Sequence, residues 1–114
     1  MAQLELTVNS KGTGVRIVKA DGFLTRLTGL MGKAAATPGL LITHCNSVHT
    51  CFMRVTIDVV FVGAGGKVVK VVPGLKPWRM LLPVRTALNT LELENGAALR
   101  LGIREGGILT FPET

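Results

Sequence analysis

Aromatic residues are scarce in this sequence, at 4% of its 114 residues, and tyrosine is absent. A core of Leu, Val, Ile and Met is therefore expected, and a hydrophobic content of 47% supplies enough of them. A chain of this length fits one domain, so residues 1–114 are expected to form a single globular unit. Fourteen glycines and five prolines indicate many tight turns, which favours a β-rich fold over a helical bundle.

Cysteine residues are few, and long apolar runs are lacking. Two cysteines cannot build a disulfide framework. No apolar run approaches the roughly 20 residues that a membrane-spanning helix requires. The first residues alternate polar and apolar side chains and lack the apolar centre of a signal peptide. These absences predict a cytoplasmic protein with no membrane span.

Acidic residues are few, and the formal net charge is +6. A positive charge is typical of proteins that bind nucleic acid or a membrane surface. Here no two Lys or Arg residues are adjacent, and no aromatic residues interleave with them as they do in proteins that bind single strands. The charge is interpreted as that of a solvated surface, and nucleic acid is not the expected partner.

The spacing of apolar residues predicts about seven short strands and one principal helix. The helix is expected to begin at Asp21 as its N-cap and to end near Gly32, with apolar residues from Phe23 to Met31 on one face. Residues 9–14 and 63–66 are turn clusters, residues 73–83 form a proline-rich loop or edge segment, and residues 97–104 suit either a strand or a helical turn. Strands are expected at residues 3–8, 15–19, 40–42, 54–62, 67–72, 88–93 and 108–111.

So many strands in so short a chain predict a mainly β (α+β) fold. A small barrel-like sheet with antiparallel or mixed pairing would hide the strand edges.

Residues 44–61 hold both histidines, both cysteines and an aspartate. The order His44, Cys45, His49, Cys51 matches none of the zinc-site spacings, so no metal site and no cofactor are expected. A Cys45–Cys51 disulfide would need an oxidising compartment. A thiol site is the remaining option, since His49 and Cys51 would share one face of an extended chain.

Asp58 is the sharpest single signal, because aspartate is disfavoured in strands and its neighbours are branched apolar residues. A buried carboxylate must find partners. One interpretation is a latch that ties the hairpin to a neighbouring segment through backbone donors, the Thr50 hydroxyl or an arginine. The other is a carboxylate that faces a pocket and is paired with His49. Candidate arginines are Arg26, Arg54, Arg79 and Arg85.

Six short motifs, in order, resemble a family known as domain of unknown function 192. This resemblance implies a compact, mainly β, barrel-like domain of the kind found in small bacterial proteins, and it implies no settled activity. The chain departs from the family pattern at Val55-Thr56, at Gly63 and at Gly107. The matching pieces are Arg26 with Gly29-Leu30-Met31, residues 38–42, Cys45 with His49-Thr50 and Met53, residues 57–61, Gly66-Lys67-Val68 with Pro77-Trp78-Arg79, and residues 91–96.

Two functions are carried forward from these observations. The first is a non-enzymatic binding or accessory module with a pocket near His49 and Asp58, which would hold a small ligand or a peptide. The second is a small hydrolase that uses His49 and Asp58 as acid and base, with Cys51 or Cys45 assisting. Whether the protein is an enzyme, and its oligomeric state, stay open. The expected binding residues are His49, Thr50, Met53, Asp58, Trp78 and Arg26.

Overall fold

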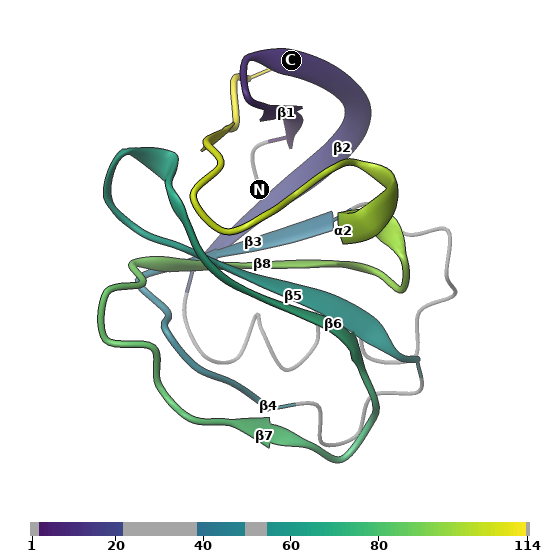
Figure 1. Ribbon diagram of the computed structural model, residues 1–114, viewed down its shortest axis with the longest axis vertical. Coiled ribbons are helices and arrows are strands. Elements are labelled where there is room, and N and C mark those ends of the chain that lie inside the picture. The colour runs from purple at the N-terminus through teal and green to yellow at the C-terminus, as the bar shows by residue number, and fades with distance from the viewer. Residues whose placement is uncertain (1–2, 22–38, 50–54, 114) are drawn as a thin grey trace.

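The computed structural model describes residues 3–21, 39–49 and 55–113. Nine strands lie in these ranges, and seven of them form one curled sheet in the order β6-β5-β8-β3-β2-β1-β9 (Figure 1). The other two, β4 and β7, form a separate antiparallel ribbon. The strands are β1 (Gln3–Val8), β2 (Lys11–Asp21), β3 (Gly39–Thr43), β4 (Val48–His49), β5 (Ile57–Val62), β6 (Val68–Leu75), β7 (Met80–Leu81), β8 (Asn89–Glu94) and β9 (Leu109–Thr110).

The sheet is mixed, which is one of the two pairings expected from the sequence, because β2 and β3 pair in parallel while the other pairs are antiparallel. It curls into a half-barrel (Figure 1). An isolated bridge between Lys67 and Ile108 links the segment before β6 to the segment before β9, so the two ends of the strand order approach each other there.

Two faces of the sheet are covered by different elements. Val60, Val62 and Leu91 point to one face, where they pack with Ala97 and Ala98 of the helical turn α2 (Ala97–Arg100). We call this the α2 face. Alternate residues Ile57, Val59 and Phe61 point to the other side and pack with Leu81 of β7. This is the β7 face, and Figure 1 shows α2 and β7 on opposite sides of the sheet.

The predicted β5–β6 hairpin is confirmed, with a 3-10 turn, η1 (Ala64–Gly66), at its tip. β6 runs through Pro73, which is tolerated because β6 is the edge strand of the seven-stranded sheet. Residues 97–104 begin with a helical turn, which was one of the two structures expected there. No helix in the described ranges is both long enough and apolar enough to cross a bilayer.

One local prediction is wrong. The first turn is Asn9-Ser10 alone, not residues 9–14, since Val8 pairs with Lys11 and both turn residues have the positive φ that a two-residue hairpin loop requires. Asp21 is the last residue of β2, and its backbone pairs with Thr43 of β3. The helix predicted beyond it, and with it the predicted role of Asp21 as N-cap, lies outside the described residues.

Candidate functional site

Asp58 lies in β5 with its side chain fully buried, at 0% exposure. Its Oδ1 accepts a hydrogen bond from the backbone N–H of Gly74 at 2.9 Å. Its Oδ2 accepts two more, from the N–H of Gly96 at 3.1 Å and the N–H of Ala98 at 2.9 Å. The carboxylate therefore joins three segments: β5, the end of β6, and the turn from β8 into α2.

These contacts explain why an aspartate is stable in an apolar strand. Hydrogen bonds to an ionised acceptor are stronger than bonds between neutral groups, and three of them offset the cost of removing the charge from water. The donors are backbone groups, and not the arginines that the sequence offered as candidates. The geometry is that of a latch, and no water-exposed edge of this carboxylate is left to meet a substrate.

His49 and Asp58 are on opposite sides of the sheet. The backbone of His49 belongs to β4 and pairs with Met80 of β7, whose neighbour Leu81 packs on the β7 face. Asp58 points to the α2 face, where it binds Gly96 and Ala98. The backbone of His49 and the carboxylate of Asp58 therefore lie on opposite sides of the sheet, and the pairing of the two side chains stays a prediction.

Of the other expected site residues, Arg26, Thr50, Cys51 and Met53 lie outside the described residues, and their roles stay predictions. Trp78 lies between β6 and β7 with 59% of its surface exposed and a positive φ of 62°. It is a surface residue at this position.

A hollow of about 610 Å³ opens where β3 ends and β8 begins. This site was not predicted, although Cys45, one of its residues, was named as a candidate. The end of β3 meets the start of β8 because the two strands are antiparallel, with Thr43 opposite Asn89. The lining residues are His44, Cys45, Asn46, Ala87, Leu88 and Asn89.

Hydrogen bonds between its two walls hold the hollow in shape. The N–H of His44 donates to Asn89 Oδ1 at 3.1 Å, and the N–H of Cys45 donates to the carbonyl of Leu88 at 3.0 Å. Beneath them, Thr90 Oγ1 donates to the Cys45 carbonyl at 2.8 Å. The Cys45 thiol is half-buried and donates to the carbonyl of Ser47 at 3.0 Å.

A signal for this site does exist in the sequence. Residues 44–46 directly follow a buried apolar strand, and Asn89 is the first residue of another. The pairing of those two strands, which brings the polar ends together, is long-range information that residue spacing does not carry. Among the described residues, no three His, Cys, Asp or Glu side chains gather in a way that could hold a metal ion.

Comparison with known proteins shows extensive similarity. The family model DUF192, described as "Uncharacterized ACR", matches residues 5–111. A UPF0127 protein of Pyrococcus furiosus is 36% identical over 109 residues, which cover 90% of this chain and 93% of that protein. A UPF0127 protein of Pyrococcus horikoshii is 38% identical over 82 residues, covering 68% of this chain and 70% of the relative.

Two crystal structures share the fold. A protein of unknown function from Novosphingobium aromaticivorans has a TM-score of 0.80 and 22% identity, covering 95% of this chain and 83% of its own. A Sinorhizobium meliloti protein, described as a candidate transcription regulator, has a TM-score of 0.82 and 19% identity, covering 96% of this chain and 94% of its own. At these identities the likeness concerns the fold alone.

Proposed function

The chain belongs to the DUF192 family, and from this premise, which assigns no activity, we propose that it is a non-enzymatic binding module for a small ligand. The ligand would occupy the hollow between the end of β3 and the start of β8. The observation that carries the proposal is the hollow itself. Its volume of about 610 Å³ lies within the range of roughly 300–1,000 Å³ that is usual for small-molecule sites.

The lining suggests the chemistry of the ligand. Ala87 and Leu88 supply an apolar wall, and Leu88 is 54% exposed. The side chains of His44, Asn46 and Asn89 supply hydrogen-bonding groups, and the amide of Asn89 is already oriented by the His44 N–H. None of the six described lining residues is Asp, Glu, Lys or Arg. A compact ligand with an apolar part and several neutral hydrogen-bonding groups suits this lining.

A binding role is also favoured over the hydrolase by the state of the candidate catalytic groups. Asp58 is sealed from water and engaged by three backbone donors, and a general acid or base must reach the proton that it transfers. The Cys45 thiol at the hollow donates its hydrogen bond to the carbonyl of Ser47. His49, Thr50, Met53, Trp78 and Arg26 stay predicted binding residues.

The proposal can be tested with a library of small fragments and the amide ¹⁵N–¹H spectrum of the whole chain. Fragment binding is expected to shift the amides of His44, Asn46, Leu88 and Asn89. Leu88→Lys should abolish these shifts because it fills the hollow with a solvated charge. Leu99→Lys is the matched control, since Leu99 is 88% exposed on α2, outside the hollow.

Two outcomes would contradict the proposal. One is shifts that concentrate on Lys67, Thr86 and Glu105, which line a second hollow of about 600 Å³ beside the β5–β6 turn. The other is binding that Leu88→Lys and Leu99→Lys affect equally.

A further inference from the structure

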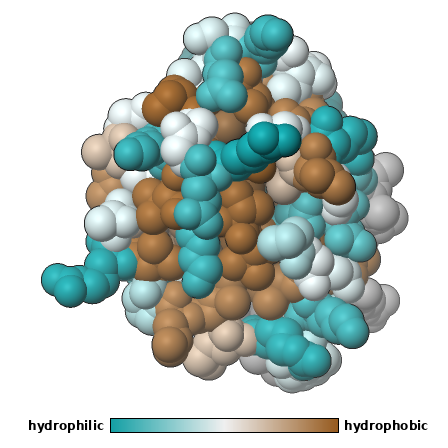
Figure 2. Space-filling view, viewed as in Figure 1, coloured by the Kyte–Doolittle hydropathy of each residue, from teal (hydrophilic) through white to brown (hydrophobic). Residues whose placement is uncertain are grey.

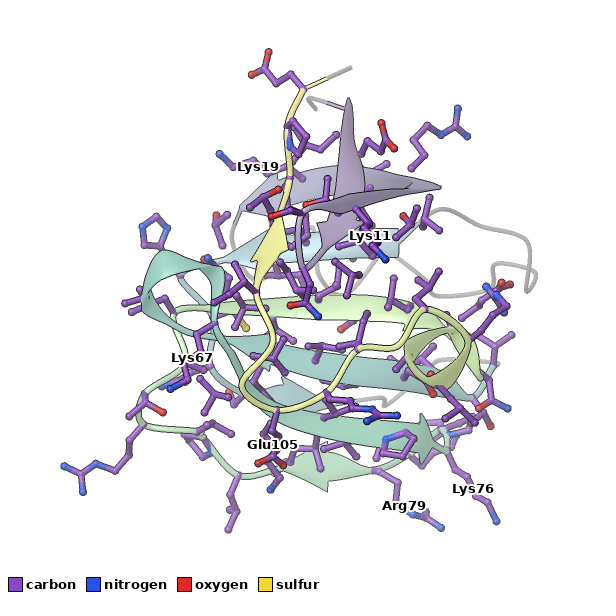
Figure 3. The ribbon with its side chains drawn as sticks, turned by 45° about the horizontal axis from the view of Figure 1, so that its top comes forward. Lys11, Lys19, Lys67, Lys76, Arg79 and Glu105 are labelled. Carbon is purple, nitrogen blue, oxygen red and sulfur yellow. The ribbon has the colours of Figure 1, made fainter. Side chains whose placement is uncertain are left out.

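The stretch from residue 59 to residue 91 contains no Asp or Glu and five Lys or Arg residues. Three of them, Lys76, Arg79 and Arg85, lie in the segment that connects β6 to β8, and all three are exposed. In Figure 3, Lys76 and Arg79 extend from the lower end of the molecule, far from Lys11 and Lys19. The segment that contains them is therefore basic, with three cationic side chains and no acidic one.

The same segment exposes large apolar side chains. Trp78 is 59% exposed, Met80 is 75% exposed and Leu82 is 81% exposed. Leu81 packs inward on the β7 face, so strand alternation turns its neighbours Met80 and Leu82 outward. Figure 2 shows apolar surface over the lower part of the molecule, where β7 lies. Adjacent apolar side chains held this far into water usually mark an interaction site.

The segment is held in place rather than loose. β7 pairs with β4, and the N–H of Val84 donates to the carbonyl of Asn46 at 2.8 Å. Pro77 and Pro83 restrict the backbone on either side of β7. The exposed side chains are thus presented before any partner arrives, which lowers the entropic cost of binding. We call the six residues Lys76, Trp78, Arg79, Met80, Leu82 and Arg85 the basic–apolar ridge.

We propose that the basic–apolar ridge docks on the surface of an anionic lipid bilayer. Trp78, Met80 and Leu82 enter the interfacial region, and the three basic side chains contact lipid phosphates. Tryptophan favours the headgroup level of a bilayer, and each basic residue near an anionic surface strengthens binding about fivefold. This inference concerns a different surface from the ligand hollow and does not depend on it.

A bilayer suits the ridge better than other polyanions. The apolar ridge residues are more than half exposed and so project outward, and a deformable interface can surround projecting side chains. A single strand of nucleic acid is held by several aromatic platforms, whereas the ridge has one aromatic residue and two aliphatic ones.

Trp78 is the only tryptophan of the chain, so its fluorescence reports directly on the ridge. The probe is a vesicle of phosphatidylcholine and phosphatidylserine in equal parts, with phosphatidylcholine alone as the control lipid. The full chain is expected to sediment with the anionic vesicles, with a blue-shifted Trp78 emission that brominated acyl chains quench. Raising the salt concentration should weaken binding, because it screens the attraction to phosphate.

Matched variants locate the contact. The double change Met80→Ser and Leu82→Ser should weaken partitioning at least about tenfold, because two apolar side chains no longer leave water. Arg79→Gln should weaken it about fivefold. Leu99→Ser and Lys11→Gln, at exposed positions away from the ridge, should leave it unchanged.

Several results would overturn the proposal. An unchanged Trp78 emission with no sedimentation would do so. So would binding that depends on Lys11 but not on Met80 and Leu82. Equal binding to soluble polyglutamate or single-stranded DNA, insensitive to the Met80→Ser and Leu82→Ser change, would assign the ridge to a soluble polyanion instead.

Discussion

Asp58 shows how one residue can connect elements that are distant in the chain. Its two oxygens bind N–H groups 16, 38 and 40 residues further along. A carboxylate is suited to this role because it offers several lone pairs and a full charge. An asparagine side chain has the same size but only one oxygen. Its NH₂ group would face at least one of the backbone N–H groups, so that two donors would meet.

Asp58→Asn should therefore lower the free energy of unfolding by about 3 kcal/mol, since at least one buried N–H loses its acceptor and the remaining bonds lose their charge assistance. Urea denaturation followed by circular dichroism measures the change. The control is Glu94→Gln, which removes the exposed ion pair between Glu94 and Arg100 at 3.0 Å and should cost no more than about 1 kcal/mol. Equal losses in the two variants would show that the three hydrogen bonds contribute nothing special.

The sequence indicates the Asp58 latch but not its partners. An aspartate among Ile57, Val59 and Val60 is a visible anomaly. Gly74, Gly96 and Ala98 donate through their backbone N–H groups. Almost every residue has such a group, so the residue types do not reveal which ones bind Asp58. The hollow is hidden for a related reason, because His44 and Asn89 become neighbours only through the pairing of β3 with β8.

At the scale of elements, the β5–β6 hairpin was the best-predicted piece. Its β-branched strands and its glycine-rich tip are formed by residues that are close together in the sequence. Residue type alone is therefore enough to predict them. Residues 11–14 illustrate the opposite case. Their two glycines favour a turn locally, yet pairing of Lys11 with Val8 and of Gly12 with Thr7 places them in β2.

The tip of this hairpin offers a matched pair of glycines. Gly65 and Gly66 both have positive φ, at 69° and 79°. A Cβ on Gly65 would meet open space, whereas a Cβ on Gly66 would overlap the carbonyl oxygen of Leu109 in β9. Gly65→Ala should cost roughly 1–2 kcal/mol for its left-handed backbone.

Gly66→Ala should cost about 2 kcal/mol more than Gly65→Ala, because a backbone oxygen cannot move aside as a flexible side chain can. Thermal and urea unfolding of both variants measure the difference. Identical losses would mean that η1 does not pack closely against β9.

On the scale of the whole molecule, the stabilising Asp58 carboxylate and the proposed ligand hollow lie toward opposite ends of the paired strands β5 and β8. Asp58 lies opposite Leu93 on β8, and the hollow begins at Asn89, which lies opposite Val62. Four residues of strand separate the two positions, or about 13 Å. The latch and the proposed ligand site should therefore respond independently to substitution.

The most direct test of this account is the dissociation constant of one fragment found to bind the hollow. It would be measured for the native chain, Asp58→Asn and Leu88→Lys at a temperature where all three are folded. The account predicts that Asp58→Asn melts at a lower temperature yet keeps its affinity. Leu88→Lys should keep its melting temperature and lose affinity by at least about tenfold, or ~1.4 kcal/mol. Loss of affinity in folded Asp58→Asn, with Leu88→Lys binding as the native chain does, would contradict it.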